Sequence, residues 1–206
     1  MKYQKTLLMS ASCFLLAILC AVLWGYQKDE SMAQRIAPNI LRFHVLANSN
    51  SGKDQQMKNE VKSLILESLH SCPASSKEEL STYINEHKEE LENQANLYLS
   101  QYGCGYHAAI NITKAYFPSK AYGDLVLPCG TYDTVQVRLG QARGRNWWCV
   151  LYPKLCFIDA THSILPEESR QELKCLLSEE DYLALFERPS QIHIKLKLLQ
   201  YFDSTP

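Results

Sequence analysis

The stretch ILRFHVLANSNSGKDQQMKNEVKSLILESLH (residues 40–70) decides the fold class, because its hydrophobic period changes along its length. In its first part, LRFHV, three apolar residues alternate with Arg42 and His44. A period of two predicts a strand with one face buried and the other facing water. The stretch therefore predicts a half-buried strand that carries Arg42 and His44 on its solvent face.

A helix is predicted beyond the polar loop of this stretch. Over residues 53–70 apolar side chains recur at the spacing of one helix face, at Met57, Val61, Leu64, Ile65 and Leu69. Ser76 and Glu79 form a capping-box pattern, which begins a second helix that runs to about Gly103, with His87 in its apolar stripe. Two helices that follow a strand are expected to pack on one face of a sheet.

The remaining chain predicts further strands and two short helices. Alternating or apolar runs predict strands at residues 106–117, 132–139 and 147–152. Beyond Pro166 we expect helices at residues 167–177 and 179–187 and a late edge strand at residues 192–198. The fold class is therefore α+β, with strand, helix, helix, a mostly antiparallel sheet, and a C-terminal extension of helices and a strand.

The chain is expected to hold one exported domain, since no repeat or low-complexity tract divides it. Its 206 residues, 46% of them hydrophobic, are enough for one substantial core. A formal net charge of -1 gives no global positive field, so we expect no nucleic-acid partner. The expected boundaries are residues 1–33 for a signal peptide or membrane anchor, 34–39 for a linker, 40–165 for the exported domain, and 166–206 for C-terminal helices and a strand that belong to or pack on it.

The N-terminus has the layout of an export signal. Lys2 and Lys5 precede the apolar run of residues 6–24, and charged residues follow it. The run is close to the ~20 residues that span a bilayer, so an uncleaved anchor is an alternative to a cleaved signal. The sequence Ser-Met-Ala at residues 31–33 offers a cleavage site, and the two alternatives stay open.

Exported cysteines can form disulfides, and this affects the motif NWWCVLYPKLCF. Cys149 and Cys156 lie among apolar residues, which raise a thiol pKa and disfavour a nucleophilic thiolate. We therefore expect a disulfide between them, rather than a thiol hydrolase in which one of them acts with His162 and Asp159. The pairing of the other exported cysteines stays open: Cys72, Cys104, Cys129 and Cys175.

Patterns for cofactors and metals are weak. Cys104 and His107 lack the second pair of ligands that a zinc site needs. The glycine-containing run at residues 140–146 lacks the Lys-Ser/Thr ending of a phosphate loop, and it is interpreted as a hairpin connection. We therefore expect no cofactor, no metal and no small-molecule substrate.

Trp147 and Trp148 are adjacent in a predicted strand, so their side chains are expected on opposite faces of the sheet. One of them can fill the core. The other must be covered by a lid of the same chain or by a partner. A partner is one of these alternatives because exposed Trp beside Arg and Tyr is typical of an interaction hot spot.

Three pieces of the chain, in this order behind an export signal, resemble the stage II sporulation protein R family. They are LRFHVLANSNSGKDQQMKNEVK (residues 41–62), YGDLVLPCGTYDTVQVRLG (residues 122–140) and NWWCVLYPKLCFID (residues 146–159). The resemblance covers about residues 40–160. It implies a signalling protein that is exported from the forespore into the space between two membranes, where it activates a membrane-embedded aspartic protease of the facing membrane. That protease then processes the precursor of the mother cell's early sigma factor.

If the resemblance holds, the chain is a ligand and not an enzyme. Its contact surface is expected where core packing explains the motif residues least, at Trp147, Trp148, Tyr152, Asn48, Ser49, Asp54 and Gln55. An exported thiol hydrolase, a wall-modifying enzyme and a structural protein that binds the envelope are the alternatives.

Overall fold

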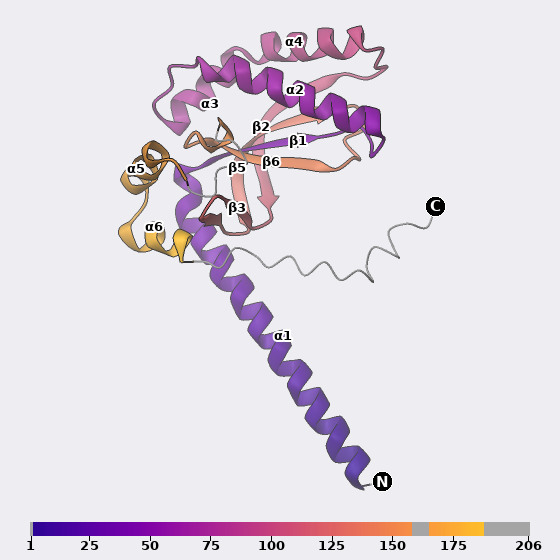
Figure 1. The fold of residues 1–206 in the computed structure, drawn as a ribbon, viewed down its shortest axis with the longest axis vertical. Coiled ribbons are helices and arrows are strands. Elements are labelled where there is room, and N and C mark those ends of the chain that lie inside the picture. Colours follow the sequence, from indigo (N-terminus) through magenta and orange to yellow (C-terminus); the bar gives the residue numbers. More distant parts are fainter. Residues whose placement is uncertain (1, 158–164, 188–206) are drawn as a thin grey trace.

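The computed structural model describes residues 2–157 and 165–187 (Figure 1). Its helices are α1 (Lys2–Ile36), α2 (Gly52–His70), α3 (Lys77–Glu86), α4 (Lys88–Gln101), α5 (Glu167–Leu176) and α6 (Glu179–Phe186), with 3₁₀ turns η1 (Ala37–Asn39) and η2 (Leu155–Phe157). Its strands are β1 (Leu41–Leu46), β2 (Ala108–Phe117), β3 (Lys120–Tyr122), β4 (Leu125–Leu127), β5 (Gly130–Leu139) and β6 (Asn146–Tyr152). The predicted α+β class is confirmed, while the late strand expected at residues 192–198 lies outside the described residues.

The main sheet has four strands in the order β2-β5-β1-β6. β1 runs parallel to β5 and antiparallel to β6, and β2 runs antiparallel to β5. The mostly antiparallel sheet is thus confirmed. Because β1 lies between β5 and β6, however, the loop at residues 140–145 crosses the end of β1 and is not the hairpin connection that we expected. The small hairpin of β3 and β4 has too few residues to show a period, and it was not predicted.

Helices α2, α3 and α4 cover one face of the sheet (Figure 1). Phe43 and Val45 of β1 pack there with Val61 and Ile65 of α2, and all four are fully buried. The predicted second helix is divided at His87, whose φ of -100° and ψ of 11° end α3 before α4 begins. Its apolar stripe continues across the break, which is why the period alone predicted one helix.

A second layer covers the other face of the sheet. The C-terminal turns of α1, the β3-β4 hairpin, α5 and α6 supply it (Figure 1), and Ile36, Phe117 and Leu173 are fully buried in its core. Arg42 and His44, which we expected to face solvent, are therefore only 0% and 4% exposed. The prediction of a half-buried β1 is wrong, because alternation reports the polarity of each side chain and not the layer that covers it.

The N-terminal part of helix α1 extends from this domain as a long exposed rod (Figure 1). Its apolar part is long and apolar enough to cross a membrane, with a mean hydropathy of 1.9, and is consistent with a signal peptide or a membrane anchor. Trp24 at the end of that part is 75% exposed, whereas Met32, Ala33 and Ile36 are 2%, 0% and 0% exposed. Of residues 34–39, expected to be a linker, the first three thus complete α1, with Ile36 in the core, and the last three form η1.

Candidate functional site

The Asp54 carboxylate organises the loop between β1 and α2. Asp54 is 7% exposed and accepts hydrogen bonds from Tyr106 Oη at 2.7 Å, Asn48 Nδ2 at 2.9 Å and Ser49 Oγ at 2.5 Å. Burial alone would raise the pKa of Asp54, but the hydrogen bonds from Ser49, Tyr106 and Asn48 outweigh it and lower the pKa to about 2. The carboxylate is therefore ionised at neutral pH and holds three donors from two parts of the chain.

The loop between β1 and α2 also binds the connection between β5 and β6 through hydrogen bonds. Asn48 Oδ1 accepts from the backbone N–H of Gln141 at 3.0 Å, and Asn50 Oδ1 accepts from that of Arg145 at 2.8 Å. Gly144 donates its N–H to the Ala47 carbonyl at 2.9 Å, and a Cβ at Gly144 would overlap the carbonyl of Ser49. The two loops therefore form one rigid surface, which we call the loop clasp: residues 47–51 and 140–146.

Trp147 and Trp148 lie on opposite faces of β6, as the period of two predicted. Trp147 packs edge-on against Phe43 on the helix face, with ring centroids 5.9 Å apart, and the Lys62 ammonium lies 5.1 Å from a Trp147 ring centroid. Trp148 stacks on His44, with centroids 3.6 Å apart. Each indole is half-buried, so each covers core and still presents an edge to the surface.

His44 is buried beneath Trp148 and is uncharged in the fold. Burial lowers the pKa of His44 to about 4, because the imidazolium would lose its hydration there. Neither ring nitrogen of His44 makes a hydrogen bond of standard geometry among the described residues, and the nearby Asn146 side chain opposes only part of the lowering of the pKa. His44 therefore packs within the core and does not face solvent.

Arg42 is a buried residue that the sequence pattern placed on the solvent face. Its guanidinium lies 4.3 Å from the Phe117 ring centroid, 5.1 Å from that of Tyr132 and 6.0 Å from that of Tyr122. Within residues 2–157 and 165–187 none of its nitrogens has a hydrogen-bond partner. The aromatic faces therefore supply the attraction that offsets part of the lost hydration of the cation.

The motif cysteines, Cys149 in the middle of β6 and Cys156 in η2, lie within hydrogen-bonding reach of each other. Both are free thiols in this structure, and Cys149 is only 4% exposed. Burial, followed by hydrogen bonding with Cys149, raises the pKa of the Cys156 thiol well above its ordinary value. The structure thus brings the predicted pair together, while Asp159 and His162 of the thiol-hydrolase alternative lie outside the described residues.

The other predicted contact residues differ in accessibility. Tyr152 is 6% exposed and donates its hydroxyl to the Ser75 carbonyl at 3.0 Å. Gln55 is half-buried and donates from Nε2 to the Ser49 carbonyl at 2.9 Å. Tyr152 and Asp54 can therefore support a contact surface only from within, whereas Asn48, Ser49 and Gln55 lie at its edge.

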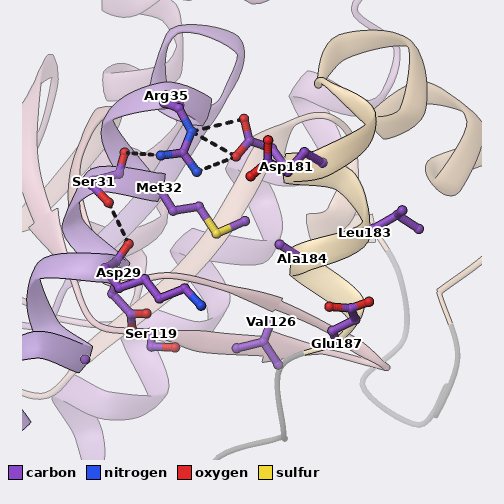
Figure 2. A pocket seen from close by; sticks show the side chains of 13 residues that line it. Asp29, Ser31, Met32, Arg35, Ser119, Val126, Asp181, Leu183, Ala184 and Glu187 are labelled. Carbon is purple, nitrogen blue, oxygen red and sulfur yellow. Dashed lines mark hydrogen bonds and ion pairs between the residues drawn. The ribbon is translucent and has the colours of Figure 1, made fainter. Parts of the chain in front are cut away.

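A pocket of about 870 Å³ lies between α1 and α6, at the base of the domain where the rod of α1 begins (Figure 2). Met32, Val126 and Leu183 supply apolar walls, and charged side chains surround the opening. We call it the basal pocket. It combines residues of α1 and α6 with Ser119 and with Val126 of β4, and no sequence pattern predicted it.

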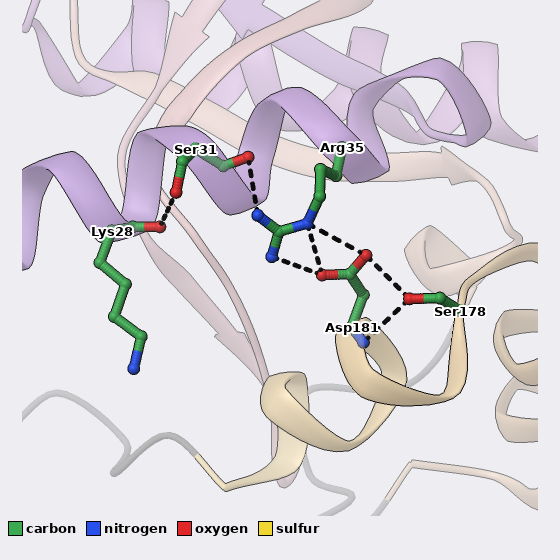
Figure 3. A network of polar contacts seen from close by, with 5 residues as sticks. All are labelled: Lys28, Ser31, Arg35, Ser178 and Asp181. Atoms are coloured by element: carbon green, nitrogen blue, oxygen red, sulfur yellow. Dashed lines mark hydrogen bonds and ion pairs between the residues drawn. The ribbon is translucent and has the colours of Figure 1, made fainter.

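One wall of the basal pocket is held by an ion pair between α1 and α6 (Figure 3). Arg35 donates from Nη2 to Asp181 Oδ1 at 2.7 Å and from Nε to the same oxygen at 3.0 Å. Ser178 Oγ donates to Asp181 Oδ2 at 2.9 Å and also accepts from the N–H of Asp181, which caps α6. The hydrogen bond from Arg35 is the main cause that lowers the pKa of Asp181.

Side chains of the metal-ligating types do not gather in the part of the chain that the structure describes. Among residues 2–157 and 165–187, no group of three or more His, Cys, Asp or Glu side chains is placed to hold a metal ion. Of the predicted contact residues, Asn48, Ser49 and Asp54 are joined by hydrogen bonds within or beneath the loop clasp, and Tyr152 is buried. What this arrangement presents to its surroundings is a rigid surface with aromatic and cationic edges.

Comparison with known proteins gives a consistent result. The family model described as stage II sporulation protein R matches residues 37–162. Stage II sporulation protein R of Bacillus subtilis (strain 168) is 30% identical to this chain over 177 residues, which cover 82% of this chain and 78% of the relative. No solved structure matches. The chain, whose loop clasp and tryptophan-cysteine strand lie within the matched region, therefore belongs to the stage II sporulation protein R family.

Proposed function

We propose that this sporulation protein is a signalling ligand, which activates a membrane-embedded aspartic protease in the facing membrane. That activation leads to processing of the mother cell's early sigma-factor precursor. Family membership supports the proposal. The single structural observation that supports it most is the loop clasp. Its polar groups hold its shape, and Arg143 and Arg145 at its edge are exposed.

The proposed contact surface combines the loop clasp with Trp147. Lys53, Arg143 and Arg145 are exposed there, and Lys62 lies over the Trp147 ring. A cationic rim around a half-buried indole is suited to an acidic, partly apolar segment of the partner. Asp54 fixes this surface from below through its three hydrogen bonds.

A ligand of this kind acts by preferring the active state of its receptor. Moving a receptor from 1:99 to 99:1 needs about 5.5 kcal/mol of preference between the two states. Truncating an aromatic or arginine anchor at the centre of an interface costs about 2 kcal/mol or more. An interface with a few such anchors is therefore sufficient.

We further propose that α1 is retained as a membrane anchor. Cleavage after residue 33 would cut the helix where Met32 and Ala33 are buried, and it would remove the turns that lead Arg35 to Asp181. Gly130 supports this, because a Cβ there would overlap the Cβ of Ala33, so helix and strand are in close contact. The rod would then hold the domain at a fixed height above its own membrane.

The proposed function is tested in cells that express this chain, the candidate protease and the sigma-factor precursor together. We expect processing to require this chain, to be lost in Arg145→Glu and Trp147→Ala, and to survive Tyr102→Ala, which alters an exposed aromatic at the C-cap of α4. Far-UV circular dichroism of each purified variant verifies folding. Processing that stays unchanged in both Arg145→Glu and Trp147→Ala would contradict the contact surface.

The thiol-hydrolase alternative is tested in the same cells with His162→Ala. A ligand retains activity in this variant, because the chemistry belongs to the protease. Loss of processing by a folded, exported His162→Ala protein would favour the enzyme instead.

A further inference from the structure

The basal pocket lies beside the point where the exposed apolar part of α1 ends. Gly25, which lines the pocket, directly follows Trp24, the last residue of the exposed apolar part of α1. At a rise of 1.5 Å per residue, residues 25–29 lie within about 8 Å of that point. The headgroup layer extends about 5–8 Å beyond the hydrocarbon core on each side. If α1 spans a membrane, one side of the pocket therefore lies at headgroup height.

The pocket wall continues onto the lipid-facing surface of the rod. Gly25, Lys28, Met32 and Arg35 recur at helical spacing, so they share one face of α1, and the apolar residues of the rod extend that face toward the N-terminus. On the opposite wall, Leu183 of α6 is 50% exposed (Figure 2). A lipid whose chains follow the rod would thus have its headgroup in the pocket and an apolar side chain beside it.

The charges of the pocket select among headgroups. Its lining holds two basic residues, Lys28 and Arg35, and four acidic ones, Asp29, Glu180, Asp181 and Glu187, a net charge of -2 at neutral pH. Arg35 and Asp181 pair with each other, whereas Lys28, Glu180 and Glu187 form no ion pair within residues 2–157 and 165–187. Both a cation and carboxylates therefore remain available to a ligand.

We propose that the basal pocket binds the headgroup of an ethanolamine phospholipid from the membrane that holds α1. The lipid ammonium donates hydrogen bonds to Glu180 and Glu187, and Lys28 binds the phosphate. A choline headgroup cannot donate such bonds, and a glycerol headgroup brings its negative charge into a pocket that is already negative. The inference rests on the proposed retention of α1.

Lipid binding is measured with the full chain in detergent. Short-chain phosphatidylethanolamine, phosphatidylcholine and phosphatidylglycerol with identical acyl chains are titrated separately, and native mass spectrometry counts the lipid bound at each concentration. We expect the ethanolamine lipid to bind about tenfold more tightly than either of the others, which corresponds to about 1.4 kcal/mol. Equal affinities, or a preference for phosphatidylglycerol, would overturn the assignment.

Two variants separate the pocket from general lipid contact along the rod. Glu180→Gln with Glu187→Gln removes both proposed acceptors of the ammonium, so binding of phosphatidylethanolamine should weaken to the level of phosphatidylcholine. Glu179→Gln removes an exposed carboxylate of α6 outside the pocket lining, and it should retain the preference. A preference that survives in the double variant would refute the site.

The intact mass of the exported protein distinguishes failure of the anchor from failure of the pocket. A mass that includes α1, together with no lipid preference, refutes only the pocket. A mature chain that begins beyond residue 33 refutes the retained anchor, and with it the lipid site. Precursor processing is scored separately, so a loss of lipid preference with normal processing leaves the signalling proposal intact.

Discussion

Replacing Asp54 with Asn tests whether the loop clasp depends on an ionised carboxylate. The pKa of Asp54 is lowered to about 2 in the fold, while an unperturbed Asp has a pKa near 3.9. At 1.36 kcal/mol per pKa unit the full difference corresponds to about 2.5 kcal/mol. The network lies near the surface, where water screens charge, so we expect the ionised form to contribute about 1–2 kcal/mol to the free energy of unfolding.

The sign of the pH dependence follows from the direction of the shift. Because folding lowers the pKa of Asp54, the stabilisation is fully present above about pH 4 and is lost as the pH falls toward 2. In Asp54→Asn we expect the free energy of unfolding at pH 7 to fall by about 1–2 kcal/mol. We also expect a smaller loss of stability between pH 4.5 and pH 2 than in the original chain.

Urea unfolding of the full chain in detergent, followed by near-UV circular dichroism at several pH values, measures both quantities. Glu67→Gln is the matched control, since Glu67 is exposed on the same helix. A destabilisation by Asp54→Asn that is equal at pH 7 and pH 2.5 would refute the reasoning, because it would then come from geometry and not from the charge.

Three further predictions concern other parts of the structure. Because burial lowers the pKa of His44 to about 4, the free energy of unfolding should fall as the pH drops from about 6.5 toward 4. In His44→Leu, the free energy measured by urea unfolding should change less over this pH range. An unchanged pH dependence would contradict a buried neutral imidazole. Arg35→Ala removes the partner of Asp181, so hydrogen exchange should become faster in α6 but not in α2, whereas uniform exchange in both would contradict a local role. Cys149 and Cys156 are predicted to pair after export, and non-reducing peptide mapping that recovers both as free thiols would disprove this.

Local pattern predicted the elements whose signal lies within one segment. The stripe of Met57, Val61 and Ile65 predicted α2 almost to its ends, since one helix face packs on one layer. The alternation at Trp147 and Trp148 likewise placed the two indoles on opposite faces. Residues 167–177 and 179–187 correspond closely to α5 and α6.

The features that the sequence did not predict depend on contacts between distant segments. The local sequence pattern predicts that Arg42 faces solvent, but in the structure α1 and the β3-β4 hairpin cover it. No local pattern reports that second layer. The bond from Tyr106 to Asp54 joins residues far apart in the chain, so the loop at residues 48–55 looked like a free surface. Tyr152 was chosen for contact because it belongs to the motif, yet its hydroxyl reaches inward to Ser75.

The position of β1 has a consequence for the way the protein matures. In a chain exported from its N-terminus, β1 would be the first strand to emerge, but it lies in the interior of the sheet, and its neighbours are β5 and β6 near the other end of the domain. The β5 edge of β1 would lack its strand partner until Leu139 has crossed the membrane, and the β6 edge until Tyr152 has crossed. Such late, long-range pairing slows folding and exposes an apolar strand to aggregation. A helix that keeps each newly translocated chain tethered at one point of the membrane would keep neighbouring copies apart during this interval.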